Sequence, residues 1–328
     1  MIRTLTLHED ALAHIGERLE ALRLPLEIAT FGNDGAVAFR GATLAPGEHD
    51  AGYLWLSRQA TAAMGQPALF DAALAFRSVD VLQTYNAGLD HPFYAAIAAK
   101  GARICNSSAQ GVAIAEYVFA ELLAVLHPAE RRRALQAERK WELTPFREIS
   151  RTRWLILGHG PIGAALAHRA KAFGAAVDVV RRSPAGTADA DRAGTLADLP
   201  RFLPDADIVI LACPLTPETR GLAGAEFFAA LKPGAILVNV ARGALVETPA
   251  LLSALDGGRL STAILDVFDQ EPLPVESPLW SHPGVRMTAH TSYAGDGAGG
   301  RWDALFLDNV ARWARGEPLA RLAEPSAG

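Results

Sequence analysis

The sequence predicts an α/β protein with two doubly wound parallel-sheet domains. Short apolar strands alternate with helical stretches along nearly the whole chain, which is the pattern of parallel sheets covered by helices. The chain has 328 residues and half of them are apolar, so it can bury two separate cores. A glycine-rich turn, LGHGPIG at residues 157–163, separates an apolar strand from a helical stretch near the middle of the chain.

Residues 1–103 are expected to form the first domain. The segment RTLTLH predicts a strand that leads into the helical ALAHIGERLEAL. Three further segments predict strands, PLEIAT, YLWLS and VLQTYNAG, and PALFDAALAF predicts a helix before the last of them. From Ala109 a long helical stretch is predicted to run to about Arg133, where a group of arginines suits a helix C-terminus.

The second domain repeats the alternation of strands and helices. Its expected strands are WLILG, AAVDVV, DIVILAC, AILVNV, STAILDV and VRMTAH. Six such strands make a Rossmann sheet the most economical interpretation. A glycine-rich segment follows His290, and RWDALFLDNVARWARG then predicts a final helix that packs back on the first domain.

The composition restricts the class of partner. The net charge of −5 and a pI near 6.0 argue against nucleic-acid and anionic-membrane partners. The first residues contain no signal-peptide core, and Glu116 and Glu121 interrupt the longest apolar region, so no membrane span is predicted. Cys105 and Cys213 lack a CxxC spacing, and no metal-ligand spacing appears. We expect a cytoplasmic protein without a metal site.

The glycine-rich turn predicts a dinucleotide site. Gly158 permits the tight turn after the strand, Gly160 lets the backbone approach a pyrophosphate, and Gly163 lets the next helix pack closely on the sheet. The helix N-terminus then presents free N–H groups to the phosphates. The cofactor contacts expected in this turn are Gly158, His159, Gly160, Pro161, Ile162 and Gly163.

The end of the next strand indicates which dinucleotide binds. An NAD site usually has an acid there, about 20 residues after the turn, to bind the ribose hydroxyls. This chain has Arg181, Arg182 and Ser183 instead, which can bind a 2′-phosphate through charge-assisted hydrogen bonds, so NADP is the expected cofactor. Two alternatives stay open: the arginines are solvated strand-end residues, or Asp178 is the ribose ligand of an NAD enzyme.

Three later segments provide candidates for a substrate site. Arg242 follows one apolar strand, Asp266 and Glu271 lie around the end of another, and His290 ends the last one. Ligands of doubly wound sheets bind beyond the carboxyl ends of the strands. All these side chains therefore point to the same edge of the predicted sheet.

Seven segments, in this order, resemble the D-isomer-specific 2-hydroxyacid dehydrogenase family. They are YNAGLDH, NSSAQGVAIAEYVFAELLAVL, LGHGPIG, LACPLTPETRGL, LKPGAILVNVARGALV, LDVFDQEP and MTAH, and they cover nearly the whole chain. Within the family the chain is most similar to the NADP-dependent glyoxylate and hydroxypyruvate reductases, partly because of RRSP at residues 181–184. One departure is Ala289, where a proline commonly precedes the histidine; it removes no catalytic group.

The resemblance implies a domain arrangement. A dinucleotide-binding Rossmann domain of residues 104–290 would be inserted in a smaller, flavodoxin-like substrate domain made of residues 1–103 and 291–328. It also implies a homodimer formed through an arm at residues 109–145, which includes Trp141.

The resemblance also implies site residues for reducing a small 2-keto acid to the D-2-hydroxy acid. Arg242 would bind the substrate carboxylate and polarise the carbonyl, His290 would donate the proton, and Glu271 would orient the imidazole and keep it charged. Asp266 would contact the nicotinamide amide. Further cofactor contacts are implied at Cys213, Pro214, Thr219 and Ala241. Backbone N–H groups near Ala87 and Gly88 would hold the carboxylate, and Arg58 is a possible substrate contact or a surface arginine.

Rival functions differ in what they require. A short-chain dehydrogenase needs Tyr-x-x-x-Lys, and none of the five tyrosines has a lysine four residues later. A phosphoglycerate dehydrogenase with a regulatory domain is not expected, since the sequence ends at Gly328. An NADP-sensing or corepressor-like binding protein of the same fold remains the alternative, and turnover of any 2-keto acid would exclude it.

Overall fold

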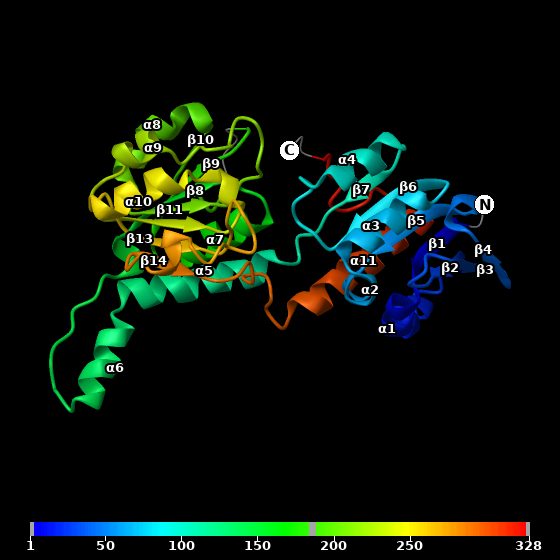
Figure 1. Cartoon of the computed structure of the whole chain (residues 1–328), viewed down its shortest axis with the longest axis horizontal. Coiled ribbons are helices and arrows are strands. Elements are labelled where there is room, and N and C mark those ends of the chain that lie inside the picture. Colours follow the sequence, from blue (N-terminus) through cyan, green and yellow to red (C-terminus); the bar gives the residue numbers. More distant parts are fainter. Residues whose placement is uncertain (1–2, 184–187, 326–328) are drawn as a thin grey trace. The chain divides into compact units, whose positions relative to one another are not determined.

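The computed structural model describes residues 3–183 and 188–325, which form two compact units (Figure 1). The first unit contains the described residues up to Ala109 and from Asp296 onward, and the second contains residues 110–295. The sequence placed these boundaries at 103/104 and 290/291. The first boundary lies later because β7 (Arg103–Cys105) still pairs with β6 (Ser78–Thr84) of the first sheet.

The first unit contains a sheet of seven described strands in the order β4-β3-β2-β1-β5-β6-β7. The strands not yet given are β1 (Arg3–His8), β2 (Leu26–Phe31), β3 (Val37–Phe39), β4 (Ala42–Leu44) and β5 (Asp50–Leu56). Five of the seven run parallel in the flavodoxin order, with the first strand inside and the later strands added outward, as predicted. The antiparallel β3–β4 hairpin at the edge was not predicted. Its two-residue turn, Arg40–Gly41, has positive φ at both positions, which suits a tight hairpin.

Five helices of the described chain belong to the first unit: α1 (Glu9–Glu20), α2 (Arg58–Met64), α3 (Gln66–Ala75), α4 (Pro92–Ala99) and α11 (Ala298–Arg315). The last of these, α11, comes from the far end of the sequence. Phe306 of α11 stacks on Trp55 of β5 at 3.7 Å, and Asp303 accepts hydrogen bonds from His14 and Arg18 of α1. The final helix therefore returns to the first sheet, as the sequence predicted.

The second unit contains seven described strands, all parallel, in the order β10-β9-β8-β11-β12-β13-β14. They are β8 (Arg153–Leu157), β9 (Ala176–Val180), β10 (Arg192–Gly194), β11 (Ile208–Leu211), β12 (Ala235–Asn239), β13 (Leu260–Leu265) and β14 (Val285–Met287). This is the Rossmann order, with a seventh strand added at the edge. Because every strand runs the same way, all their carboxyl ends meet at one edge of the sheet.

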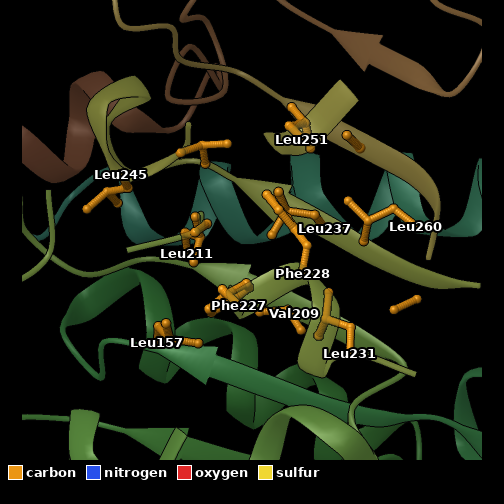
Figure 2. Close-up of a cluster of buried hydrophobic side chains, with 14 of the residues drawn as sticks. Leu157, Val209, Leu211, Phe227, Phe228, Leu231, Leu237, Leu245, Leu251 and Leu260 are labelled. Atoms are coloured by element: carbon orange, nitrogen blue, oxygen red, sulfur yellow. The ribbon is translucent and has the colours of Figure 1, made fainter. Parts of the chain in front are cut away.

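The helices of the second unit are α5 (Gly111–Leu126), α6 (Ala129–Ala137), α7 (Pro161–Ala172), α8 (Leu199–Phe202), α9 (Ala225–Ala230) and α10 (Thr248–Asp256). Figure 2 shows part of its core, where Val209 and Leu211 of β11 and Leu237 of β12 meet Phe227 and Phe228 of α9. The strands are nearly continuous apolar runs because a parallel sheet is buried on both faces. This packing fixes the strand ends that present the site residues.

The single helix predicted over residues 109–133 is wrong. The helix breaks at Pro128, which lies between α5 and α6. Proline provides no backbone N–H and its ring clashes with the preceding turn, so it interrupts a helix. Helix α6 extends away from the sheet of its unit (Figure 1), and the segment after it exposes Trp141, Leu143 and Phe146. Within the described residues no single helix has the length and apolarity to cross a membrane, and one bent pair, α5 with α6, meets those criteria by length and composition alone.

Candidate active site

The glycine-rich turn joins β8 to α7 where the strand order reverses, between β8 and β11. Gly158 has φ +100°, and a Cβ there would lie 2.4 Å from the Ala212 carbonyl oxygen. A Cβ on Gly163 would lie 1.9 Å from the carbonyl oxygen of Gly158. Packing within the chain therefore explains these two glycines.

Gly160 needs another explanation. A Cβ at this position would meet open space, so packing within the described chain does not require glycine there. Gly160 is the N-cap of α7 and Pro161 is its first residue, so the first-turn N–H groups face beyond the helix end. Open space at a helix N-terminus fits the pyrophosphate of a dinucleotide.

His159 adds a polar side chain to this turn. Its Nε2 atom is buried and, within the described chain, has no hydrogen-bond partner. Burial, followed by the nearby charge of Arg181, lowers the pKa of His159, and Asp189 opposes this effect. An unsatisfied buried nitrogen also fits a site completed by a ligand.

The arginines at the end of β9 lie where the sequence placed them. Arg181 is half-buried and its backbone N–H donates to the Gly194 carbonyl, while Arg182 and Ser183 are exposed. Pro184 of the RRSP segment lies outside the described residues. The proximity of Arg181 to His159 brings the end of β9 next to the glycine-rich turn.

Asp178 is engaged elsewhere. Its side chain is completely buried in β9, and both carboxylate oxygens accept hydrogen bonds from Arg153 and Arg192. No exposed oxygen is left for a ribose hydroxyl. The geometry therefore argues against Asp178 as the ribose ligand, the alternative that the sequence left open.

We expect Asp178→Asn to lower the free energy of unfolding without changing the choice between NADPH and NADH. The two arginines are about one-third exposed, so the loss should be about 2–3 kcal/mol, below the 3–5 kcal/mol typical of a fully buried pair. Urea denaturation measures it. Asp308→Asn is the matched control, because it breaks a surface pair with Arg312 and should cost under about 0.5 kcal/mol. A changed cofactor preference in Asp178→Asn would return this residue to the cofactor site.

Arg242 lies three residues beyond β12, in a turn that Asn239 holds. The Asn239 side chain accepts from the Ala241 N–H at 3.1 Å and donates to the Arg242 carbonyl at 2.9 Å. The Arg242 side chain is half-buried and donates to the Ala241 carbonyl at 2.7 Å. A Cβ on Gly243 would lie 1.8 Å from the backbone of Phe268, so this glycine lets the Arg242 turn pack against the segment leading to Glu271.

Glu271 and His290 form the central pair of the site. Glu271 Oε2 lies 2.7 Å from His290 Nδ1, and Oε1 accepts from the Phe268 N–H at 2.9 Å. Both side chains are partly exposed, at 36% and 44%. With Nδ1 bound to the carboxylate, Nε2 is the ring nitrogen left for a substrate. The carboxylate therefore fixes the orientation of the imidazole ring.

Asp266 is buried beside His290 and holds the backbone around it. Its carboxylate accepts from the N–H groups of Thr291, at 2.8 Å, and Ser292, and from the Thr288 hydroxyl at 2.6 Å. Three of these bonds go to Oδ1 and one to Oδ2. These four bonds use the roughly four acceptor positions of the carboxylate, and Asp266 is 1% exposed, so the carboxylate serves the backbone around His290.

The remaining cofactor contacts expected in this unit lie after β11 and β12. Cys213 and Pro214 follow β11 after Ala212, and burial raises the pKa of the Cys213 thiol to about 11. The Thr219 hydroxyl is used within the loop, where it donates to the Pro214 carbonyl and accepts from the Thr216 N–H. Ala241 is buried in the Arg242 turn. Thr219 therefore shapes the loop that presents Cys213 and Pro214.

The expected substrate contacts Ala87, Gly88 and Arg58 belong to the first unit. Ala87 and Gly88 follow β6, and Asn106 anchors their turn by donating to the Ala87 carbonyl at 2.7 Å. Arg58 is exposed at the start of α2 with its guanidinium 5.0 Å from the ring centre of Trp302. Among the described residues, no group of three His, Cys, Asp or Glu side chains is arranged to hold a metal ion.

The sequence did not single out several residues that organise this site. Asn239 had a recognisable signal, because an Asn after a strand often makes an Asx turn. Tyr117 and Thr288 had none: their hydroxyls meet at 2.9 Å although 171 positions separate them in the sequence.

Comparisons with known proteins identify the family of the chain. Residues 119–292 match the family model described as D-isomer specific 2-hydroxyacid dehydrogenase, NAD binding domain. Glyoxylate/hydroxypyruvate reductase A of Serratia proteamaculans is 37% identical over 176 residues, which are 53% of this chain and 56% of that relative. The chain thus matches about half the length of that curated relative.

Two solved structures match over almost their full length. A D-isomer specific 2-hydroxyacid dehydrogenase from Xanthobacter autotrophicus Py2, in complex with NADPH and MES, is 28% identical with a TM-score of 0.78 and 99% of both chains covered. A D-isomer specific 2-hydroxyacid dehydrogenase family protein from Aeromonas salmonicida subsp. salmonicida A449 is 31% identical with a TM-score of 0.76, again with 99% of both chains covered. The chain therefore belongs to the D-isomer specific 2-hydroxyacid dehydrogenase family.

Proposed function

We propose that this chain is an NADPH-dependent reductase that converts a small 2-keto acid of the glyoxylate or hydroxypyruvate type to the D-2-hydroxy acid. The observation that carries the proposal is the 2.7 Å pair of Glu271 and His290, at the same edge of the sheet as the glycine-rich turn. A histidine acid and a dinucleotide site on one sheet edge are the requirements of carbonyl reduction.

The cofactor site would use the second unit. The open space at Gly160 and the N-terminus of α7 fit a pyrophosphate, and the Arg181–Arg182–Ser183 segment fits a 2′-phosphate. Asp266 would lie beside the nicotinamide amide, as the resemblance implies, while its carboxylate holds the backbone that follows His290. The NADPH complex of the Xanthobacter relative supports this choice of cofactor. When bound, the nicotinamide supplies a hydride for carbon C2 of the keto acid.

The chain's own residues would handle the charge and the proton. Arg242 is always charged, so it can bind the substrate carboxylate and stabilise negative charge on the carbonyl oxygen. His290 would donate a proton from Nε2 to that oxygen. The imidazolium that precedes this step is stabilised by Glu271, which is itself held by the Phe268 N–H.

We assign substrate binding by the first unit to the turn at Ala87 and Gly88, with Arg58 as a further contact. The anchoring of that turn by Asn106 supports a preformed carboxylate site, because the turn's backbone need not be ordered when the substrate arrives.

A homodimer is part of the proposal. The part of the 109–145 arm that follows α6 exposes Trp141 completely and Leu143 almost completely. Large exposed apolar side chains close in sequence are typical of an interface. Both cysteines are free, which agrees with a reducing, cytoplasmic location.

A substrate screen tests the proposal. Glyoxylate, hydroxypyruvate, pyruvate and phenylpyruvate are each mixed with enzyme and NADPH, and the absorbance at 340 nm is followed, with NADH as the matched control. We expect turnover of at least one of glyoxylate and hydroxypyruvate, with NADPH preferred. Binding of NADPH without turnover of any keto acid would instead indicate a cofactor-sensing protein.

A further inference from the structure

We propose that Thr288, supported by Tyr117, is a positioning residue for His290 and acts through the carboxylate of Asp266. The inference rests on the proposed function, because His290 is the proton donor only there. The backbone of His290 has a φ of +52°, in the left-handed region that residues other than glycine rarely adopt. Such a backbone persists only where its surroundings hold it.

Asp266 provides that hold. Its carbonyl oxygen accepts from the His290 N–H at 2.8 Å, and its carboxylate accepts from Thr291 and Ser292, the two residues that follow. The Thr288 hydroxyl donates to the same carboxylate from the other side of His290. The chain thus wraps around one buried carboxylate from residue 288 to residue 292, and Thr288 is the side-chain donor among these bonds.

The Thr288 hydroxyl is itself held by Tyr117 of α5. The structure places Thr288 Oγ1 to donate to Asp266 Oδ1 at 2.6 Å and to the Tyr117 oxygen at 2.9 Å. A hydroxyl has one proton and the charged carboxylate is the stronger acceptor, so the Tyr117 contact acts mainly on the position of the threonine side chain. Burial raises the pKa of Tyr117 to about 12. These contacts connect α5 to Asp266 through Thr288.

This support matters because β14 is an edge strand. Among the described strands it pairs with β13 alone, over three residues, just before His290. Helix α5 adds a second attachment one turn further on, where Glu121 accepts from Arg286 at 2.8 Å. The helix therefore fixes the strand at residues 286 and 288, and residue 288 is the attachment that reaches Asp266.

The test compares Thr288→Val, Thr288→Ser and Tyr117→Phe with wild type. Thr152→Val is the matched control: it removes another buried threonine hydroxyl of the same unit, which donates to the Ile149 carbonyl at 2.6 Å. We expect Thr288→Val to lower kcat by roughly 10- to 100-fold, since small misplacements of a catalytic group cost that much. Its Kd for NADPH, measured by fluorescence, should change less than about threefold, because the Asp266 carboxylate still accepts from the backbone N–H groups of Thr291 and Ser292. Thr288→Ser should recover most of the rate, Tyr117→Phe should show a smaller loss, and Thr152→Val should keep the wild-type kcat.

A second readout needs no turnover. In protein with 13C-labelled histidine and no cofactor, the His290 Cε1–H resonance is assigned as the one missing in His290→Asn. We expect it to shift or broaden in Thr288→Val and Tyr117→Phe, and to stay unchanged in Thr152→Val. If the proposed reduction does not occur at all, this spectrum still decides whether Thr288 positions His290.

Two results would overturn the proposal. The first has two parts: the wild-type enzyme is active and loses that activity in His290→Ala, yet Thr288→Val keeps the wild-type kcat and the wild-type His290 resonance. The other is a loss in Thr288→Val no larger than in Thr152→Val, which would show general destabilisation. If Thr288→Val does not fold, the same comparison is made with Tyr117→Phe, which removes only the outer bond, and a wild-type spectrum and rate there would contradict the proposal.

Discussion

His290→Ala should lower kcat by at least 100-fold and leave the Kd for NADPH nearly unchanged. Loss of a general acid typically costs roughly 10²- to 10⁴-fold in rate. The imidazole is positioned to donate from Nε2 because Glu271 occupies Nδ1. In the proposed reaction it would contribute to the chemical step and not to binding of the adenosine end. Steady-state rates at saturating NADPH, together with fluorescence titration, measure both quantities.

Glu271→Gln is the informative companion variant. The amide can still contact the ring, but it carries no charge to stabilise the imidazolium, so the loss in kcat should be smaller than in His290→Ala. A wild-type rate in His290→Ala at neutral pH would show that another group donates the proton.

The double variant Arg181→Ala/Arg182→Ala should lose the preference for NADPH. Each charge-assisted hydrogen bond to a phosphate contributes on the order of 1.5–3 kcal/mol, so two arginines can supply a preference of roughly tenfold to a thousandfold. Arg182 is exposed and Arg181 half-buried, so solvent and salt should hold the value near the lower end. The KM for NADPH should rise while the KM for NADH stays almost unchanged.

Two controls accompany this prediction. Arg201→Ala removes an exposed arginine from the same unit and should leave both KM values unchanged. Raising the ionic strength should weaken the preference of the wild type for NADPH over NADH, as the double substitution does. Equal use of NADH and NADPH by the wild type at low salt would show that the two arginines are solvated strand-end charges.

Local patterns in the sequence predicted the glycine-rich turn and six of the seven described strands of the second sheet, all except β10 (Arg192–Gly194). Runs such as DIVILAC are apolar because both faces of a parallel strand are buried, and the carboxyl ends of such strands must share an edge. The same argument predicts Arg242, Glu271 and His290 at one edge of the second sheet from the sequence alone.

Features that depend on distant pairs were not predictable. No local pattern shows that Arg153 and Arg192 enclose Asp178, so the sequence alone does not exclude Asp178 as a ribose ligand. The Tyr117–Thr288 contact also joins segments whose proximity only the folded sheet creates. The break at Pro128 is predictable in principle, since proline disfavours a helix interior.

The most direct test of the central claim is the product formed from hydroxypyruvate and NADPH. We predict that one molecule of D-glycerate appears for each NADPH oxidised, measured by chiral chromatography alongside absorbance at 340 nm, and that His290→Ala forms almost none in the same time. Formation of L-glycerate, or bound NADPH that is not oxidised with any of the four keto acids, would contradict the account.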